Sequence, residues 1–455
     1  MLPRCADRDN ISIVFSWKFK SSPKLMEVYK SWSCNKCEEV PTLGHLPCLK
    51  VLEINEMDNV RCIGTKFYSD DNYKNALFPT LRRLKLSSMM NLVEWKDAKE
   101  LTTATCEVFP CLEELIIEGC AKLTSAPCHF PSLKKLEISE ICSKAFENIS
   151  SKLTTLTSLV IESVSELGCL PEQLLQNNTS LMSLEISYCS ELESISQHQD
   201  VWAFCTSLRS LNIYECEKLS YILDGLHKLI SLENFELIGC GNLRCFPRHT
   251  WCHAPSSTLE GAASLRQLVM SWCGVEALLI GLKSCTSLQI LRIEECPNLK
   301  RISEGLPESL KTLKIGPFCE MLEAFPSLIN STSIQHSIEH LYLNGWAKLN
   351  SLPDQIQSFT ALKVLLIANF DGMEALPEWL GNLSSLQKLY LLWCNNLMYL
   401  PRTQAMRCLT KLHIYDCPKL KERCVEGSSA EWLNVADIPI IIIDEEYIKG
   451  NESED

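Results

Sequence analysis

One spacing of apolar residues recurs along most of this 455-residue chain and limits what it can fold into. The pattern is Leu-x-x-Leu-x-Ile-x-x-Cys-x-x-Leu, where x is any residue. Its copies begin, from the clearest to the weaker ones, at Leu112, Leu181, Leu208, Leu288, Leu386 and Leu409, then at Leu49, Leu81, Leu133, Leu156, Leu232, Leu265, Leu310, Ile338 and Leu362. These are about fifteen repeats, roughly 21 to 33 residues apart, which is a period typical of stacked-repeat architectures. We therefore expect a solenoid and not one compact core.

Each repeat predicts one short strand. In the copy that begins at Leu181, Leu184 and Ile186 are separated by the polar residue Glu185. This alternation is typical of a strand with one buried face. A single repeat cannot bury its own apolar row, but stacked repeats can, and their strands then pair as a parallel sheet.

The cysteines at the ninth position of the repeat have two possible interpretations. They are Cys120, Cys189, Cys216, Cys240, Cys273, Cys296, Cys394 and Cys417. Metal or redox ligands would have to converge on one point, whereas one cysteine per repeat produces a line along the solenoid. Met89, Trp346 and Phe370 occupy the same position in other repeats. We therefore favour small buried side chains that hold the turn after the strand.

No motif indicates catalysis, a metal or a cofactor. Cys34 and Cys37 form a lone C-x-x-C pair, and His249 and His253 lie near Cys245 and Cys252, but neither group has the second ligand pair of a zinc site. The phosphate loop, H-E-x-x-H and G-x-S-x-G are all missing from the sequence. We expect a binding protein and not an enzyme.

Charge and hydropathy narrow the possible partners and location. The net charge is -13 and no long run of Lys and Arg interrupts it, so we expect no binding to nucleic acid. The longest apolar run, 438–443, is too short to span a bilayer, so we expect no membrane insertion. The first residues do not resemble a secretory signal. These features favour a cytoplasmic protein with reduced cysteines.

The chain divides into three regions by this reasoning. Residues 1–48 are a degenerate repeat region, in which Ile11, Ile13 and Phe15 could form a strand and Lys30 occupies a position expected to be apolar. Residues 49–424 form the repeat array. Residues 425–455 supply a final strand that covers the last repeat, followed after Asp444 by a loose acidic tail.

Three stretches together carry a resemblance to a known family. They are Cys37 to Ile54 with Ile63 to Tyr68 after it, the repeat as it stands from Leu386 to Pro401, and the closing segment from Trp432 to Asp444. The chain resembles the leucine-rich-repeat region of plant nucleotide-binding leucine-rich-repeat disease-resistance proteins of the coiled-coil class. The implied fold is an α/β repeat solenoid, a curved horseshoe with a concave parallel β-sheet and an irregular or short-helical convex side.

The sequence departs from that family in two respects. No Gly-Lys pair occurs in it, so the phosphate loop of the nucleotide-binding domain is missing, and no heptad stretch precedes the repeats. What the resemblance implies is a sensor region for plant defence. Its expected partners are proteins: a pathogen effector, a guarded host protein, or a nucleotide-binding module that the repeats hold inactive.

Two other functions remain as alternatives. The first is a ubiquitin-ligase substrate adaptor, whose repeats usually continue into a regular helix, whereas here they continue as Leu-x-x-Leu-Pro. The second is a secreted or cell-surface receptor, because Asn148, Asn178 and Asn382 begin possible glycosylation sequons. The lack of a signal-like segment and the many cysteines argue against secretion.

The residues that flank the buried Leu and Ile of each strand point outward and are expected to bind a partner. Aromatic residues mixed with charges are what protein interfaces favour. The candidates are Glu185, Tyr188, Tyr214, Glu215, Trp272, Arg292, Glu294, Tyr342, Tyr390, Trp393, His413 and Tyr415. Trp272 and Trp393 could instead pack partly against neighbouring turns.

Overall fold

The computed structural model describes residues 26–31, 34, 36–69, 76–98, 107–197, 201–222, 226–243, 262–276, 282–299, 305–319, 322, 332–402, 406–424 and 431–450. The possible strand at residues 11–15, the group of His249 and His253, and residues 451–455 of the acidic tail lie outside these ranges. The chain forms two compact units, Met1–Leu229 and Ile230–Asp455. They are called the N-terminal and C-terminal units below.

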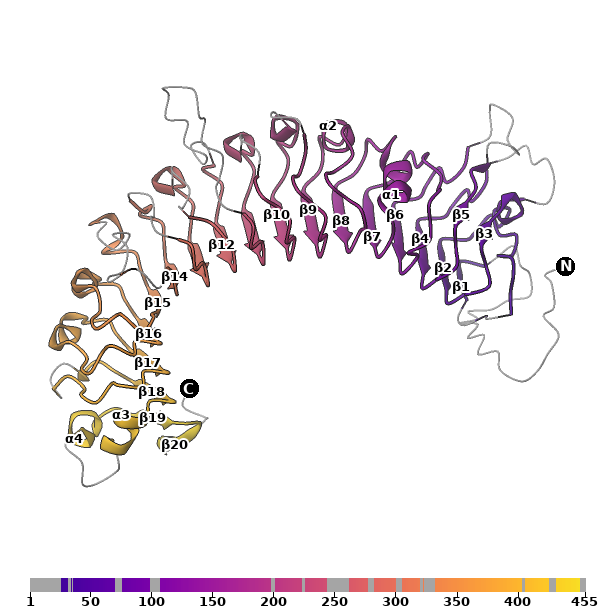
Figure 1. The fold of residues 1–455 in the computed structure, drawn as a ribbon. Coiled ribbons are helices and arrows are strands. Elements are labelled where there is room, and N and C mark those ends of the chain that lie inside the picture. Colours follow the sequence, from indigo (N-terminus) through magenta and orange to yellow (C-terminus); the bar gives the residue numbers. More distant parts are fainter. Residues whose placement is uncertain are drawn as a thin grey trace. The chain divides into compact units, whose positions relative to one another are not determined.

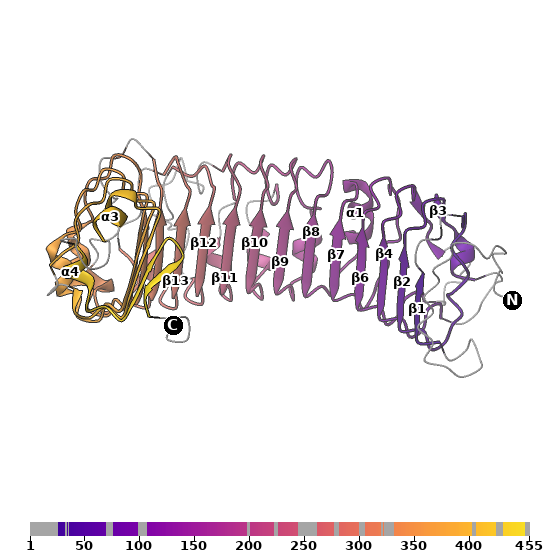
Figure 2. The same cartoon turned by 90° about the horizontal axis from the view of Figure 1, so that it is seen from below.

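The N-terminal unit is built on one parallel sheet (Figure 2). Its strands, in chain order, are β1 (Val28–Ser31), β2 (Val51–Asn55), β4 (Arg83–Ser87), β6 (Glu114–Glu118), β7 (Lys135–Ser139), β8 (Ser158–Glu162), β9 (Ser183–Ser187) and β10 (Ser210–Tyr214). Each strand pairs in parallel with the next one along the chain. The other elements are β3 (Cys62–Ile63), β5 (Glu94–Trp95), α1 (Ser143–Ser150), α2 (Leu174–Asn177), η2 (Thr65–Phe67), η4 (Val201–Phe204) and η5 (Leu226–Lys228).

The C-terminal unit repeats this arrangement (Figure 1). Its parallel strands are β11 (Asn234–Ile238), β12 (Gln267–Ser271), β13 (Ile290–Glu294), β14 (Thr312–Gly316), β15 (His340–Asn344), β16 (Val364–Ala368), β17 (Lys388–Leu392), β18 (Lys411–Tyr415) and β19 (Ile440–Ile443). Strand β20 (Glu446–Lys449) pairs antiparallel with β19. The connections hold η6 (Leu282–Ser284), η8 (Thr332–Ile334), η9 (Asp354–Ser358), η10 (Glu378–Asn382), α3 (Pro418–Arg423) and α4 (Trp432–Val435).

The predicted fold class is confirmed: both units are repeat solenoids with a parallel sheet and little helix. The apolar positions of the repeat explain why. In the repeat of β9, Leu181, Leu184 and Ile186 are buried, as are their counterparts in the other repeats. Each such side chain contributes about 1.5–3 kcal/mol relative to exposure. Every predicted repeat start is buried and precedes a strand by two residues.

A hydroxyl group just before the first leucine links successive repeats. The Oγ1 of Thr80 donates to the carbonyl of Leu49 at 3.0 Å, and that of Thr155 donates to Leu133 at 2.7 Å. Ser309 donates to Leu288 at 2.8 Å in the same way. These bonds satisfy carbonyls that the irregular turns would otherwise leave unpaired.

A row of phenylalanines fills the N-terminal unit behind the sheet. Phe67, Phe78, Phe109 and Phe130 follow one another with ring centroids 4.9, 4.9 and 5.8 Å apart. We call these four residues the phenylalanine row. Trp95 packs against both Phe109 and Phe130. The last three phenylalanines each precede a proline in F-P-x-L, a signal that the leucine pattern alone did not reveal.

The cysteines at the ninth position are buried, which confirms their interpretation as small buried side chains. The thiol of Cys216 donates to the carbonyl of Tyr214 at 3.4 Å, and that of Cys296 donates to Glu294 at 3.2 Å. Burial raises the pKa of both thiols to about 12, so they remain neutral and inert. Within the described ranges, no three His, Cys, Asp or Glu residues are grouped to hold a metal ion.

Three expectations about the ends and the cysteines were wrong. Cys34 and Cys37 form a disulfide, because a tight turn brings their Cα atoms within 5.6 Å, so not every cysteine is reduced here. Lys30 lies opposite Glu53 and points outward, since Tyr29, which is half-buried, lies opposite the buried Leu52. Residues 446–449 are not loose, because they form β20.

No helix in the described ranges is long and apolar enough to cross a membrane.

Candidate protein-binding face

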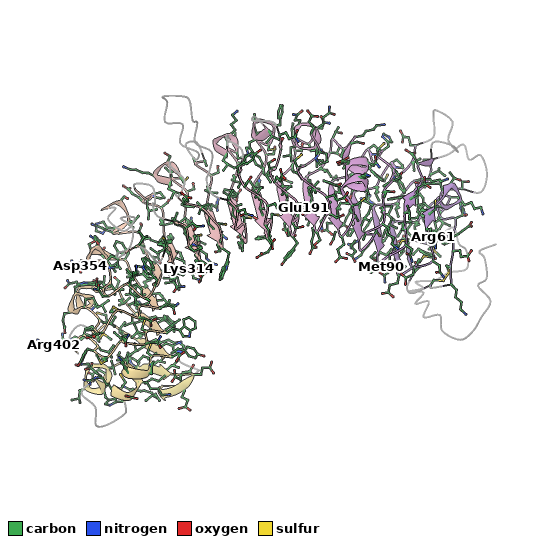
Figure 3. The ribbon with its side chains drawn as sticks, viewed as in Figure 1. Arg61, Met90, Glu191, Lys314, Asp354 and Arg402 are labelled. Carbon is green, nitrogen blue, oxygen red and sulfur yellow. A yellow bond between two sulfur atoms is a disulfide. The ribbon has the colours of Figure 1, made fainter. Side chains whose placement is uncertain are left out.

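The third, fifth and seventh positions of each repeat face away from the core, and we call their surface the strand face. Positions four and six are buried in all of the repeats predicted from the sequence, so the pleat directs the alternate residues to the other side. Figure 3 shows Lys314 on the strand side of the C-terminal unit, and Asp354 and Arg402 on the opposite, loop side.

The strand register places the fifth-position residues in one column in each unit. In the N-terminal unit the column is Lys30, Glu53, Lys85, Ile116, Glu137, Val160, Glu185 and Asn212. In the C-terminal unit it is Glu236, Val269, Arg292, Lys314, Tyr342, Leu366, Tyr390, His413 and Ile442. The candidates expected at the centre of the face therefore lie there.

The residue directly after most strands, at the eighth position, has a left-handed backbone. Among these residues, Tyr188, Trp272 and Trp393 have φ of 53°, 56° and 53°. Gly119 and Gly239 occupy the same position in other repeats, as expected where φ is positive. Yet Tyr188 is 57% exposed, Trp272 60% and Trp393 43%. A large aromatic residue here helps neither the backbone nor the core, so it is available for contact with a partner.

Ion pairs cover much of the strand face of the N-terminal unit. The amino group of Lys135 lies 2.6 Å from the carboxylate of Glu137 and 3.3 Å from that of Glu114. The hydrogen bond to Glu137 raises the pKa of Lys135. Lys30 and Glu53 are 2.7 Å apart. Such partly exposed pairs add little stability, but they leave the face polar and internally satisfied.

The strand face of β17 and β18, together with Trp393 directly after β17, is aromatic instead. The rings of Tyr390 and His413 are 5.8 Å apart, those of Trp393 and Tyr415 are 5.9 Å apart, and those of His413 and Tyr415 are 6.4 Å apart. These four residues are named the aromatic cluster. Edge-to-face pairs of this kind fix ring orientation, so the cluster is already arranged in the unbound chain.

The other eight candidates form separate groups. Glu185, Tyr188, Tyr214 and Glu215 lie on and just after β9 and β10 in the N-terminal unit. Trp272, Arg292 and Glu294 lie at β12 and β13, where the carboxylate of Glu294 is 2.8 Å from the amino group of Lys314. Tyr342, on β15, is separated from Tyr390 by Leu366 in the same column.

A shallow pocket of about 480 Å³ lies over β15 to β17 and contains residues that the sequence reasoning missed. Its lining is His340, Tyr342, Lys363, Val364, Leu366, Gln387, Lys388 and Tyr390. Leu366 was missed because β16 reads Val-Leu-Leu-Ile-Ala, in which no polar residue marks the outward positions. Aligning β16 with its neighbouring repeats would have assigned Leu366 to the face.

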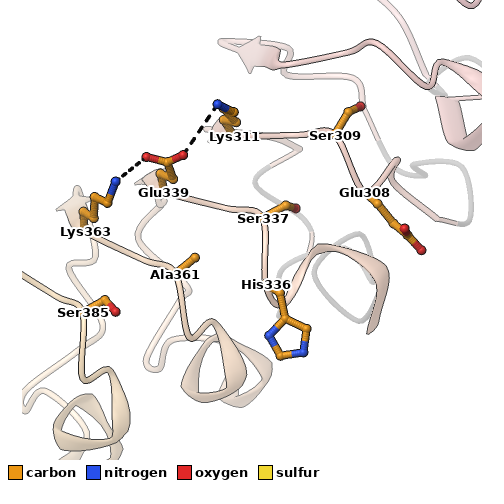
Figure 4. A pocket seen from close by; sticks show the side chains of 9 residues that line it. All are labelled: Glu308, Ser309, Lys311, His336, Ser337, Glu339, Ala361, Lys363 and Ser385. Atoms are coloured by element: carbon orange, nitrogen blue, oxygen red, sulfur yellow. Dashed lines mark hydrogen bonds and ion pairs between the residues drawn. The ribbon is translucent and has the colours of Figure 1, made fainter.

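A second pocket of about 370 Å³ adjoins it at the edge where these strands begin (Figure 4). Lys363 lines both pockets. The carboxylate of Glu339 binds the amino groups of Lys363 at 2.6 Å and Lys311 at 3.8 Å. The hydrogen bond from Lys363 lowers the pKa of Glu339. Lysines therefore flank the aromatic surface on this side, and an ionised carboxylate holds two of them in place.

Sequence comparisons place the chain among known repeat proteins. Residues 354–417, which include the aromatic cluster, match a family model described as R13L1/DRL21 LRRs. The putative disease resistance RPP13-like protein 1 of Arabidopsis thaliana is 29% identical over 213 residues, 46% of this chain and 20% of that protein. A second putative disease resistance protein of Arabidopsis thaliana is 24% identical over 401 residues, 85% of this chain and 25% of that protein.

Solved structures show the same fold. A leucine-rich-repeat protein of Leptospira interrogans aligns with a TM-score of 0.53 at 16% identity, over 83% of this chain and 93% of its own. A chain of the Toll–Spatzle complex of Drosophila aligns with a TM-score of 0.51 at 13% identity, over 88% of this chain and 51% of its own. Identities this low establish the fold and nothing further.

The chain therefore has the leucine-rich-repeat fold. Its sequence is similar to the repeat regions of plant disease resistance proteins, which confirms the resemblance found in its motifs. The chain spans about a fifth to a quarter of the length of these relatives.

Proposed function

We propose that this chain is the protein-binding sensor region of a plant intracellular immune receptor, and that it binds its partner through the strand face of β15 to β18. The observation that carries the proposal is the aromatic cluster, with Trp393 held outward by a left-handed backbone. Tyr and Trp are the residues that most often dominate binding energy at protein interfaces. Leu366 extends the apolar surface toward Tyr342.

The role in defence rests on the relatives, whose names describe disease resistance proteins. In a longer receptor the repeats would recognise a pathogen effector or a guarded host protein and hold a nucleotide-binding module inactive until then. Both tasks need a surface that binds one protein in preference to another. A rigid stack with preformed aromatic contacts suits this task, because little side-chain freedom is lost on binding.

A cytoplasmic location fits two features of the described residues. The thiols at the ninth position of the repeat are buried and form no disulfide, as expected where the surroundings are reducing. Asn178, which begins a sequon, is 1% exposed, its amide donates to the carbonyls of Leu153 and Leu174, and its Oδ1 accepts from the Leu156 N–H. That side chain cannot accept a glycan in the folded chain. A glycosidase-sensitive mobility shift of the chain from its own cells would contradict this location.

The adaptor alternative gains no support from the connections between strands. After Pro353 and Pro377 the chain forms the short 3₁₀ helices η9 and η10, not regular α-helices. Continuation into a regular helix was the feature that would have favoured an adaptor.

Affinity capture from plant cells tests the proposal. A tagged chain is compared with a strand-face variant, Tyr390→Ala with Trp393→Ala and Tyr415→Ala, and with a control variant, Tyr399→Ala with Leu433→Ala. Tyr399 and Leu433 are exposed large side chains of the same unit that lie outside its strand face. We expect the same partner proteins with the parent and the control, and their loss with the strand-face variant.

The opposite result has a clear meaning. Capture that survives the strand-face changes but fails with the control variant would assign binding to the loop side. Circular dichroism of all three proteins checks that the variants are folded, which we expect because the altered side chains lie outside the buried leucine rows.

A further inference from the structure

Four consecutive strands of the C-terminal unit carry no acidic residue. Strands β15 to β18 read His-Leu-Tyr-Leu-Asn, Val-Leu-Leu-Ile-Ala, Lys-Leu-Tyr-Leu-Leu and Lys-Leu-His-Ile-Tyr. The chain as a whole contains 56 Asp and Glu and has a net charge of -13. The charged residues of these four strands are therefore Lys388 and Lys411, on the part of the strand face that is also aromatic.

Two lysines lie beside the aromatic residues of these strands. The register sets His340, Val364, Lys388 and Lys411 side by side at the third position, where Lys411 is buried. The amino group of Lys411 lies 6.0 Å from the ring centroid of Tyr390. Lys363 joins this row at the rim of the pocket over β15 to β17, and no carboxylate lines that pocket.

Three carboxylates around this surface have partners of their own. Glu339 binds Lys363 and Lys311, and the carboxylate of Asp444 binds the amino group of Lys421 and the backbone N–H of Asp416. Asp371 accepts from the side chain of Asn395 at 2.8 Å. Glu339 balances only part of the charge of the two lysines that it binds, and Lys388 also lines the pocket. An anionic group can approach the remaining positive charge.

We propose that this surface selects an acidic peptide segment of its protein partner, with a carboxylate of the segment between Lys363 and Lys388 and an adjacent apolar side chain on Tyr342, Leu366 and Tyr390. The inference rests on the proposed function and specifies the chemistry of the partner. Charge complementarity supports it, because an interface gains specificity and association rate when opposite potentials meet. The Leu366 surface between the two tyrosines provides the apolar contact.

A nucleic acid is a poorer match for the same surface. A phosphate backbone needs a continuous basic track, since each phosphate contact contributes through counterion release. Here Glu308 and Glu339 line the adjoining pocket and interrupt any such track. A few carboxylates on a peptide match the limited basic area better.

Selection from a displayed random-peptide library on the full chain tests the inference. We expect the enriched peptides to be acidic with a neighbouring aromatic or aliphatic residue. Fluorescence anisotropy of the most enriched peptide should show binding weakened at least about tenfold by Lys363→Glu with Lys388→Glu, which corresponds to roughly 1.4 kcal/mol. The matched control, Lys348→Glu with Lys419→Glu, changes the net charge equally at exposed positions outside the strand face and should leave the affinity unchanged.

Neutral substitutions keep the test independent of folding. Lys363→Gln with Lys388→Gln should weaken binding less than the charge reversals, and added salt should weaken binding to the parent. Neutral or basic enriched peptides that still need the aromatic cluster would overturn this inference and leave the proposed function intact. A library that yields no binder would count against both. Equal binding to all variants, or displacement of the peptide by a single-stranded RNA oligonucleotide, would also overturn the inference.

Discussion

At the scale of single residues, the eighth position of the repeat distinguishes the residue type that the fold accepts from the residue types that binding would explain. A left-handed backbone costs a non-glycine residue roughly 1–2 kcal/mol, and glycine avoids this cost. Gly119 and Gly239 show that the fold accepts glycine there. Tyr188 and Trp272 have this backbone conformation despite its cost, and each exposes a large apolar ring. Contact with a protein partner is the simplest physical reason for an aromatic residue at this position.

The change Tyr188→Gly should therefore not harm the fold. We expect the free energy of unfolding to stay the same or rise by up to about 1 kcal/mol, because strain at φ of 53° is relieved while the greater freedom of glycine in the unfolded chain offsets part of the gain. Urea denaturation measures it. Ser187→Gly, one residue earlier and inside β9, is the matched control and should lose stability. A loss of several kcal/mol with Tyr188→Gly would show that the ring is structural.

The sequence predicted the residue types better than their conformations. The buried leucines and cysteines follow from the period alone, because each repeat must present the same apolar row to the next one. The disulfide between Cys34 and Cys37 could not be predicted, since it depends on the local turn geometry. Leu366 was missed because β16 contains only apolar residues, so its sequence does not show which of them face outward.

At the scale of elements, the phenylalanine row shows that packing behind the sheet is as specific as packing within it. Phe109 lies between Phe78 and Phe130, with ring centroids 4.9 and 5.8 Å away, and it is 1% exposed. Each ring comes from a different repeat, so the row ties three repeats together at once.

Removing one ring should accordingly be costly. We expect Phe109→Ala to lower the free energy of unfolding of the N-terminal unit by about 3–5 kcal/mol, through lost burial and the cavity left behind. Phe204→Ala is the control, because Phe204 is 41% exposed whereas Phe109 is 1% exposed, and its cost should be smaller. Hydrogen exchange on β4, β6 and β7 would report the loss. Equal effects of the two changes would contradict the role given to the row.

The last strands add an acid-sensitive contact. The carboxylate of Asp444, directly after β19, binds the Lys421 amino group at 2.5 Å and accepts from the Asp416 backbone N–H at 2.8 Å. The hydrogen bond to Lys421, followed by that to Asp416, lowers the pKa of Asp444 below its ordinary value. A lowered carboxyl pKa adds stability that is complete above the unfolded-state pKa and is lost as the pH falls through the folded-state pKa.

The C-terminal unit should therefore lose stability on acidification below about pH 4, in part through Asp444. The midpoint of urea unfolding, followed from neutral to acidic pH, should fall less steeply in Asp444→Asn than in the parent. Asp437→Asn, an exposed carboxyl nearby, should follow the parent curve. Identical curves for parent and Asp444→Asn would show that the contact contributes nothing to acid sensitivity.

The elements were predictable where the period is regular and not at the ends. Every strand that follows a predicted repeat start was expected, because two alternating buried residues specify a half-buried strand. β20 was not expected, since its charged residues read as a tail, yet the edge of β19 offers backbone groups for it to pair with. At β1 the register was wrong by one residue, because Tyr29 replaces the leucine that would have set it.

At the scale of the whole molecule, the two units share a fold but present different strand faces. The face of the N-terminal unit is crossed by ion pairs such as those of Lys135, whereas β15 to β18 of the C-terminal unit are aromatic and basic. Repeat stacks permit this, because the buried rows determine the fold and the outward positions vary freely. The central claim is that the aromatic part of the C-terminal unit contacts the protein partner.

Site-specific photo-cross-linking in plant cells tests that claim most directly. A photoreactive phenylalanine derivative replaces Tyr390 in the aromatic cluster or, as the matched control, Tyr399, an exposed tyrosine outside the strand face whose ring lies 4.6 Å from the guanidinium carbon of Arg423. The account predicts a covalent protein adduct from position 390, identified by mass spectrometry, and none from position 399. An adduct from position 399 alone, or from neither position, would contradict it.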